Sequence, residues 1–432
     1  MAEPTRSAAG RVPRSRGGRP GGGGSRRSAA ASGAPPAAPA VVLELVTERP
    51  APAGDVVAHA DDGRVVFIRN ALPGERVRVT ISEQNSRFLR GDVLEVLEPA
   101  SDRVAAPCPH ARPGGCGGCD LQHVAPEAQR RWKADVVRDQ LRRLGGIDGP
   151  LVEALVVEAL PDVAGALGPG LGWRTRVQWA VSGAGRPGLH RHRSHEVEPL
   201  EACPLAHALV DSAGVLGTRQ RDRRRVEVVS SPSSGQVLVG PRPSGSLTYS
   251  ADDHEFRVSG GGFWQVHPTA ADTLVAAVIE ALVPAEGEQA FDLYAGAGLF
   301  AVALARRGVS VLAVESSQLA ARDARYNLDG LPADVIHGEV AVVLAGGNTV
   351  VDGLPDHADI VVLDPPRSGA GRDVMRAIAE RHPRAVAYVS CDAATLARDL
   401  AAAREAGLAL KGLRAFDLFP MTAHLELVAV LG

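Results

Sequence analysis

The sequence predicts an α/β protein whose C-terminal part is an open parallel sheet, preceded by a small β-barrel and a central, mostly β region. From about residue 262 strands and helices alternate, and such alternation predicts parallel strands joined by crossover helices. Short β-branched segments separated by turns fill residues 41–98, which predicts the barrel. A hydrophobic content of 45% is ordinary for a soluble globular protein.

The first 40 residues are a basic segment of low complexity. They hold seven Arg and one Glu, a charge of about +6, which leaves about −9 for the remainder of a chain with net charge −3. Such a segment buries too little apolar surface to fold, so we predict disorder over residues 1–40. No apolar run reaches the roughly 18 residues of a membrane span, and no signal-peptide core follows the basic start. We therefore expect a cytoplasmic protein without a membrane partner.

Turn residues divide residues 41–100 into strands, which we expect at 41–47, 64–69, 76–82 and 88–97. Small barrels of this kind often grip oligonucleotides, and several arginines follow these strands. A solvated charged face explains the arginines equally well, so the strand pattern alone does not decide between the two.

A cysteine-containing loop opens the central region, residues 101–260, and a helix is expected from Pro126 to about Leu144. The rest of the region has many Gly and Pro turns and is expected to be mostly β. Two basic clusters, residues 190–193 and 219–225, can contact phosphates or simply form solvated loops.

Four of the five cysteines form a metal-site pattern. Cys108, Cys116 and Cys119 fall within twelve residues, and Cys203 lies far downstream. In a cytoplasmic protein such clustering favours a metal over disulfides. Three clustered ligands and one distant one resemble iron–sulfur usage more than the two short pairs of most zinc sites, although four thiolates suit zinc as well. His110 and His123 are alternative ligands that a four-thiol set does not need.

A glycine-rich turn at residues 295–298 links a strand at 290–294 to a helix, as in nucleotide-binding sheets. Glu315 ends the next strand, 23 residues after Asp292, where a carboxylate can accept hydrogen bonds from both ribose hydroxyls. Val302 stands where a dinucleotide fingerprint has its third small residue. A nucleoside ligand without a pyrophosphate, such as S-adenosylmethionine, therefore fits better than a dinucleotide.

Reactive side chains fall at the ends of the following strands. Asp364 ends the strand at 359–364, and Cys391 ends the strand at 385–391. Carboxyl ends of parallel strands share one edge, where open α/β sheets bind ligands. Glu426 lies in an apolar terminal strand, where a carboxylate is costly unless it is paired or used, and His424 is an alternative base.

Together these motifs resemble the RNA uracil-5-methyltransferase family, in its iron–sulfur-containing branch, over residues 41–432. The motifs are the four cysteines, Phe263-Trp264-Gln265, the glycine-rich turn, Asp364-Pro365-Pro366-Arg367, Ser390-Cys391, and Phe419-Pro420-x-Thr422-x-His424-x-Glu426. The resemblance implies a TRAM barrel (OB-like) over residues 41–100, an iron–sulfur loop and central β domain over 101–260, and a Rossmann-like S-adenosylmethionine-dependent methyltransferase domain over 261–432.

The resemblance also assigns roles to individual residues. Cys391 matches the nucleophile and Glu426 the base. Four residues match the S-adenosylmethionine site: Gln265, Tyr294, Glu315 and Asp364. The ligands of a [4Fe–4S] cluster match the four remaining cysteines: Cys108, Cys116, Cys119 and Cys203.

The implied activity is methylation of carbon 5 of a specific uridine in rRNA or tRNA, by a monomer, through a covalent Cys391 adduct. The uridine must leave its stack, and Phe263 or Trp264 can stack on it. Three departures concern the finer contacts: Leu299 and His267 each replace Asn, and Asp392-Ala393 replaces Asn-Pro.

Rival activities fit the sequence less well. RNA cytosine-5 methylation usually places a cysteine directly after the proline of the acidic motif, where this chain has Pro366 and Arg367. Amino-group methylation needs no cysteine and expects an aromatic residue after the two prolines. A non-catalytic RNA-binding protein with a metal-stapled core would need neither Cys391 nor Glu426.

Overall fold

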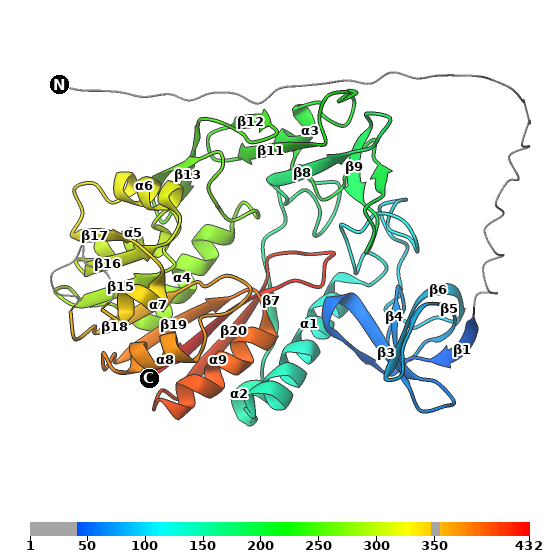
Figure 1. The fold of residues 1–432 in the computed structure, drawn as a ribbon, viewed down its shortest axis with the longest axis horizontal. Helices are drawn as coiled ribbons and strands as arrows, with labels where there is room; N and C mark the ends of the chain where they lie inside the picture. The colour runs from blue at the N-terminus through cyan, green and yellow to red at the C-terminus, as the bar shows by residue number, and fades with distance from the viewer. Residues whose placement is uncertain (1–40, 347–354) are drawn as a thin grey trace, which may run out of the picture. The chain divides into compact units, whose positions relative to one another are not determined.

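The computed structural model describes residues 41–346 and 355–432 of the chain, so the predicted disorder of residues 1–40 lies outside it. The described strands form four sheets (Figure 1). No described helix combines the length and apolar character that a membrane crossing requires.

The first sheet has six strands in the order β1-β5-β6-β4-β3-β2 and corresponds to the predicted barrel. Its buried face consists of branched apolar side chains, among them Val56, Val66, Ile68 and Val77. The sequence analysis did not predict β3, because three consecutive apolar residues in that strand hide the alternation of a half-buried strand. The elements are β1 (Val42–Val46), β2 (Arg49–Pro50), η1 (Pro52–Gly54), β3 (Asp55–His59), β4 (Val65–Arg69), β5 (Arg76–Gln84) and β6 (Phe88–Glu98).

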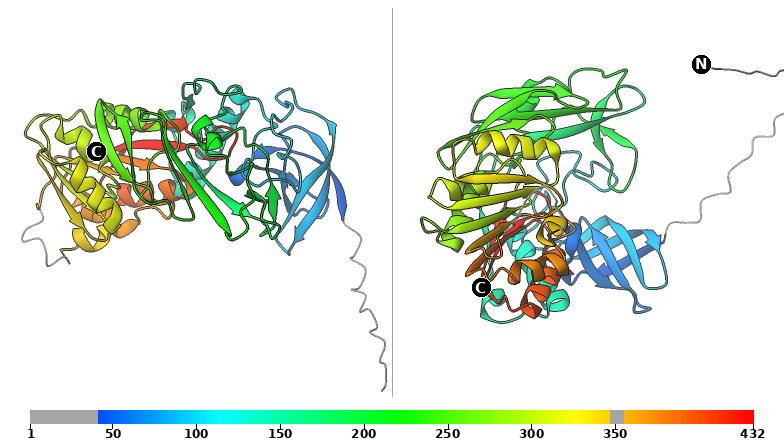
Figure 2. Two further views of the ribbon diagram at one scale, coloured as in Figure 1. Left: turned by 90° about the horizontal axis from the view of Figure 1, so that it is seen from above. Right: turned by 60° about the vertical axis from the view of Figure 1, so that its left-hand side comes forward.

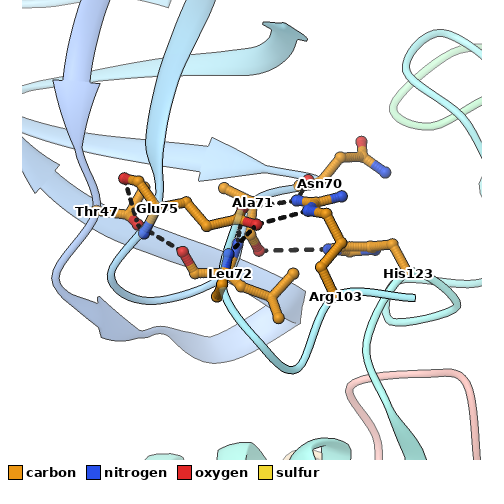
Figure 3. A network of polar contacts seen from close by, with 8 residues as sticks. Thr47, Asn70, Ala71, Leu72, Glu75, Arg103 and His123 are labelled. Carbon is orange, nitrogen blue, oxygen red and sulfur yellow. Dashed lines mark hydrogen bonds and ion pairs between the residues drawn. The ribbon is translucent and has the colours of Figure 1, made fainter. Parts of the chain in front are cut away.

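A buried ion pair joins this sheet to the segment that follows it (Figure 3). Glu75 is fully buried and accepts hydrogen bonds from Arg103 at 2.5 and 2.6 Å, from the Leu72 N–H at 2.8 Å and from the Ala100 N–H at 3.2 Å. Burial raises the pKa of Glu75, but Arg103 and the two N–H donors outweigh it, and the pKa lies below its usual value. The charged carboxylate therefore holds the turn before β5 against residues 100–103.

Part of the predicted central region belongs to the C-terminal sheet instead. Helix α1 (Pro126–Gln140) ends in a π-turn, η2 (Leu141–Gly145), and leads through α2 (Pro150–Glu153) to β7 (Val157–Ala159). Strand β7 pairs in parallel with β20 at the far end of the chain. Apolar residues of α1, such as Val137, pack in the same core as α9. The predicted boundary at residue 261 therefore does not match the packing of residues 126–159.

The rest of that region is β-rich, as predicted. A five-stranded sheet has the order β10-β9-β8-β11-β12, and a separate hairpin pairs β13 with β14. These elements are β8 (Arg176–Val181), β9 (Pro187–His190), β10 (Val197–Pro199), α3 (Ala208–Ser212), β11 (Arg225–Ser231), β12 (Gln236–Gly240), β13 (Ser246–Ala251) and β14 (His254–Ser259).

An eight-stranded sheet in the order β17-β16-β15-β18-β19-β21-β20-β7 carries the C-terminal part. Helices α4 and α5 contribute to the core on one face, and α1, α7, α8 and α9 to the core on the other (Figures 1 and 2). The elements are α4 (Ala270–Leu282), β15 (Gln289–Leu293), α5 (Leu299–Ala305), β16 (Ser310–Glu315), α6 (Gln318–Asn327), β17 (Ala333–His337), α7 (Val340–Leu344), β18 (Ile360–Leu363), α8 (Arg372–Ala379), β19 (Ala385–Ser390), α9 (Ala393–Glu405), β20 (Leu410–Asp417) and β21 (Glu426–Leu431).

Strand β21 is the reversed strand of this sheet, since it pairs antiparallel with both β19 and β20. Its first residue therefore lies at the edge where the parallel strands end. The same edge contains the topological switch point between β15 and β18, where open α/β sheets bind their ligands.

We expect Arg103→Met to destabilise the protein by about 3 kcal/mol, because it leaves the Glu75 carboxylate buried without its ionic partner. Urea unfolding followed by tryptophan fluorescence measures the loss. Arg76→Met is the matched control: Arg76 also pairs with glutamates, Glu44 and Glu98, but it is exposed, and its removal should leave the midpoint almost unchanged. Equal midpoints for the two variants would contradict the prediction.

Candidate active site

The glycine-rich turn after β15 has an unusual backbone. Tyr294, Gly296 and Gly298 all adopt positive φ, at 63°, 57° and 89°. A tyrosine in this region is strained, and such strain persists only where the surroundings enforce it. Glu315 supplies part of that enforcement, since its two oxygens accept the Gly296 N–H at 2.8 Å and the Ser317 N–H at 2.6 Å. A Cβ at Gly296 would meet no atom within 4 Å, so a ligand can approach the backbone there.

Asp292 lies beneath this turn and is fully buried. Its Oδ2 accepts the Ala301 N–H at 2.8 Å, whereas its Oδ1 has no hydrogen-bond partner among the described residues. Burial and the nearby charges of Asp364 and Glu315 raise the pKa of Asp292 to about 8. Asp292 is not among the residues predicted from the sequence for this site, where it served only as the reference for the spacing to Glu315.

Cys391 and Glu426 are neighbours across two strands. The register of β19 and β21 ends with Ser390 opposite Leu427, and Cys391 and Glu426 are the next residues on the two segments, close enough for the Glu426 charge to act on the thiol. Cys391 is partly exposed and Glu426 is buried. Asp364 follows β18, the other neighbour of β19, and the structure therefore brings the three predicted strand-end residues together.

The pKa values of these groups are shifted by burial and, for Glu426 and Cys391, by neighbouring charges. Burial raises the pKa of Glu426 well above its usual value, and the charge of Asp364 raises it further. Burial likewise raises the pKa of Asp364 to about 7. The pKa of the Cys391 thiol rises to about 11, through burial first and then through the Glu426 charge. The site thus combines a reachable thiol with two carboxyl groups that bind protons strongly.

Arg367 is the cation of this cluster, and the sequence analysis gave it no role. Its charge lowers the pKa of both Cys391 and Glu426. Asp399 braces the backbone of its loop by accepting the N–H groups of Ala370 at 2.7 Å and Gly371 at 3.2 Å. The position of Arg367 directly after Asp364-Pro365-Pro366 is the sequence signal that could have identified this residue.

His424 lies beside Arg367, with 3.4 Å between Arg367 Nη2 and His424 Nε2. Burial lowers the pKa of His424, and the Arg367 charge lowers it further. The imidazole is therefore neutral, and protonating it next to the guanidinium is unfavourable. Burial acts in the opposite direction on Glu426 and raises the pKa of its carboxyl group, which favours Glu426 over His424 as a proton acceptor.

The two aromatic residues before Gln265, Phe263 and Trp264, lie in different environments. Trp264 stacks on Tyr249 with ring centroids 4.9 Å apart and is committed to the core, whereas Phe263 is 62% exposed. Gln265 is nearly buried, and its amide makes no side-chain hydrogen bond within the described residues.

Two of the three departures from the family pattern have structural explanations. His267 is buried, and its ring stacks on Trp173. Asp392 caps α9 by accepting the Thr395 N–H at 2.8 Å, which Asn would do equally well. Leu299 is buried as the first residue of α5, and nothing in the structure explains why it replaces Asn.

Four thiols line one small cavity between the cysteine loop and the central sheet: Cys108, Cys116, Cys119 and Cys203. Two of the sulfurs accept hydrogen bonds, Cys116 from the Gly118 N–H at 3.4 Å and Cys119 from Gln122 at 3.0 Å. No three His, Cys, Asp or Glu side chains of the described residues are grouped closely enough to hold a single metal ion. The alternative ligands have other partners, since His110 lies 3.0 Å from Glu198 and His123 lies 3.3 Å from the Ala71 carbonyl.

Comparisons with known proteins cover nearly the whole described chain. Residues 42–94 match the TRAM domain family, and residues 354–431 match the tRNA (Uracil-5-)-methyltransferase family. An uncharacterized RNA methyltransferase of Streptomyces coelicolor is 44% identical, over 88% of this chain and 90% of the relative. The 23S rRNA (uracil(1939)-C(5))-methyltransferase RlmD of Halomonas elongata is 32% identical, over 90% of this chain and 89% of its own.

Among solved structures, the fold resembles a Pyrococcus abyssi tRNA (uracil-54, C5)-methyltransferase crystallised with S-adenosyl-L-homocysteine. The TM-score is 0.65 at 20% identity, and the match covers 90% of this chain and 99% of that one. The expected fold class, a barrel and a central β region ahead of a Rossmann-like methyltransferase sheet, is confirmed.

We expect Arg367→Gln to slow the alkylation of Cys391 by iodoacetamide at pH 8. Without the guanidinium the thiol pKa rises further and the thiolate fraction falls. A loss of about 1 kcal/mol of charge interaction corresponds to a rate about fivefold lower. The alkylation rates of the wild type and of Arg367→Gln should both increase with pH, because Cys391 titrates above pH 8 in each protein. The variant should react more slowly at every pH. Arg372→Gln, an exposed arginine paired with Glu405, is the control, and a variant that reacts as fast as this control would refute the assigned role.

Proposed function

Because the chain belongs to the RNA uracil-5-methyltransferase family, we propose that it methylates carbon 5 of one specific uridine in structured RNA through a covalent bond between Cys391 and the base. The observation that carries this proposal is the strand register that makes Cys391 and Glu426 neighbours, with Asp364 and Arg367 beside them.

The chemistry explains why these groups are needed together. Carbon 5 of uracil is a weak nucleophile, and addition of the Cys391 thiolate to carbon 6 converts the ring into an enolate that is nucleophilic at carbon 5. Bound S-adenosylmethionine supplies the methyl group. Glu426 then removes the proton from carbon 5, the carbon–sulfur bond breaks, and Cys391 leaves as the thiolate. Arg367 stabilises the Cys391 thiolate both before it adds to carbon 6 and when it leaves, since the charge of Arg367 favours the ionised thiol.

Four residues are proposed to hold S-adenosylmethionine: Gln265, Tyr294, Glu315 and Asp364. The open backbone at Gly296 and the unpartnered Asp292 Oδ1 fit a nucleoside ligand with hydrogen-bond donors. Glu315 retains lone pairs for ribose hydroxyls beyond the two N–H groups that it accepts. The Gln265 amide has no competing partner within the described residues.

RNA is proposed to reach this crevice with its target base flipped out, and exposed Phe263 is the side chain that can stack on it. Five arginines between α3 and the start of β11 support a phosphate-binding role for that loop, because none pairs with a carboxylate of the described residues: Arg219, Arg221, Arg223, Arg224 and Arg225. Relatives are named for both 23S rRNA and tRNA, so substrate assays require both classes.

We also propose that the four thiols bind a [4Fe–4S] cluster. They line one cavity, which fits a cluster in which each of four thiolates binds a different iron. Hydrogen bonds to the sulfurs of Cys116 and Cys119 are typical of such sites. Its role is structural, since the reaction transfers no electron. The cluster would join the cysteine loop to Cys203 of the central region.

Glu426→Gln should trap the methylated intermediate, because addition and methyl transfer proceed while proton removal fails. We expect a protein–RNA adduct that survives denaturing electrophoresis, and its absence from Glu426→Gln/Cys391→Ala. Cys391→Ala alone should lose turnover yet bind S-adenosylmethionine normally in calorimetry. Glu405→Gln, on the exposed side of α9, serves as the control. Wild-type turnover by Cys391→Ala would refute the covalent mechanism.

Anaerobically purified protein should be brown and contain about four iron atoms per chain. Cys203→Ser should lose iron, whereas Cys391→Ala should retain it, because Cys391 does not line the thiol cavity. Elemental analysis and visible absorbance measure both. One zinc and no iron in the anaerobic protein would rule out the cluster and leave the methyltransferase assignment unaffected.

A further inference from the structure

The loop that joins β20 to β21, residues 418–425, delivers His424 and Glu426 to the site and is drawn in red in Figure 1. At its centre, Met421 adopts a left-handed backbone with φ of 67°, and its side chain is buried. A methionine in this conformation is strained, so neighbouring contacts must hold it in place.

Those contacts come from one remote segment of the chain. The Met421 N–H donates to Gln129 Oε1 at 2.8 Å, and the Met421 carbonyl accepts the N–H groups of Asp120 and Leu121 at 3.1 and 3.0 Å. The Ala423 N–H donates to Asp120 Oδ2 at 3.1 Å. Both backbone polar groups of the strained residue are thus satisfied by residues about 300 positions away in sequence.

The same segment is itself firmly held. The Gln129 amide nitrogen donates to the carbonyls of Leu121 at 3.1 Å and Val124 at 2.9 Å, which fixes the orientation of its oxygen toward Met421. One turn further along α1, the fully buried Lys133 pairs with Asp417 at 2.5 Å and donates to the Phe419 carbonyl at 3.1 Å. We name Asp120, Leu121, Gln129 and Lys133 the loop clamp.

The remaining hydrogen bonds of the loop are local, apart from the contact between Arg367 and His424. Thr422 donates to the Phe419 carbonyl at 2.8 Å and accepts the His424 N–H at 3.2 Å. These bonds shape the turn but do not fix its position relative to β19. In addition to the ladders that pair β21 with β19 and β20, the loop clamp provides the long-range polar contacts, within the described residues, that hold the loop leading into β21.

We propose that Asp120 and Gln129 are positioning residues for the base: through Met421 and Ala423 they hold Glu426 in reach of carbon 5 of the uracil bound to Cys391. This rests on the proposed function, in which Glu426 removes that proton. Loss of the clamp therefore slows release of the covalent adduct more than its formation. A misplacement of about 1 Å can reduce a rate about 100-fold.

The test is a single-turnover reaction of the full-length protein with unmodified RNA and methyl-labelled S-adenosylmethionine, resolved on denaturing gels. Asp120→Ala and Gln129→Leu should form labelled adduct at nearly the wild-type rate and release it about 10- to 100-fold more slowly, so that the adduct accumulates. Asp120→Asn retains a side-chain oxygen that can accept the Ala423 N–H and should restore release. Gln140→Leu is the matched control, since Gln140 is a buried glutamine of α1 whose side-chain amide bonds, among the residues that the structure describes, only to Asp139.

A purely structural role gives a different result. Lower activity without adduct accumulation, or equal losses in Gln129→Leu and Gln140→Leu, would overturn the proposal. If adduct accumulates in Glu426→Gln but not in Asp120→Ala or Gln129→Leu, the positioning role of the loop clamp is refuted, while the proposed role of Glu426 stands. Normal turnover of Glu426→Gln without any adduct would overturn both the clamp proposal and the proposed role of Glu426.

Discussion

The reversal of β21 within an otherwise parallel sheet is the constraint on which the candidate site depends. In a fully parallel sheet the first residue of a strand lies at the amino edge, away from the ligand crevice. Because β21 runs the other way between β19 and β20, its first residue, Glu426, meets Cys391 at the carboxyl edge. The proposed nucleophile and the proposed base, 35 positions apart in sequence, thus become neighbours.

Burying several acidic groups at one edge is costly, and the fold offsets this cost locally. Burial raises the pKa values of Asp292, Asp364 and Glu426, and neighbouring carboxylate charges raise those of Asp292 and Glu426 further. Arg367 reduces that penalty for Glu426 while also favouring the Cys391 thiolate. The same burial that disfavours the ionised carboxylates raises their affinity for protons, a common compromise at functional sites.

Sequence reasoning identified what depends on strand ends and missed what depends on tertiary packing. Regular alternation was sufficient to place Glu315, Asp364 and Cys391 at one edge, since the topology of parallel sheets determines where strands end. The alternation of strands and helices could not show that Glu315 accepts hydrogen bonds from two backbone N–H groups. Nor could it show that Trp264 packs in the core while Phe263 is exposed. Contacts such as that between Gln129 and Met421 join residues with no local pattern in common, so no periodicity could reveal them.

The pairing of β7 with β20 has a consequence for how the chain is assembled. The outer edge of the eight-stranded sheet is closed by a strand synthesised about 250 residues before its partner. In topological terms the five-stranded sheet and the β13-β14 hairpin are therefore an insertion within a discontinuous α/β unit. During translation, β7 and the apolar face of α1 emerge long before β20 and must remain unpaired until it arrives. A fragment that began at α4 would retain β15 to β21 but lack β7, and it would expose β20 as an unprotected edge, an arrangement that favours association between chains.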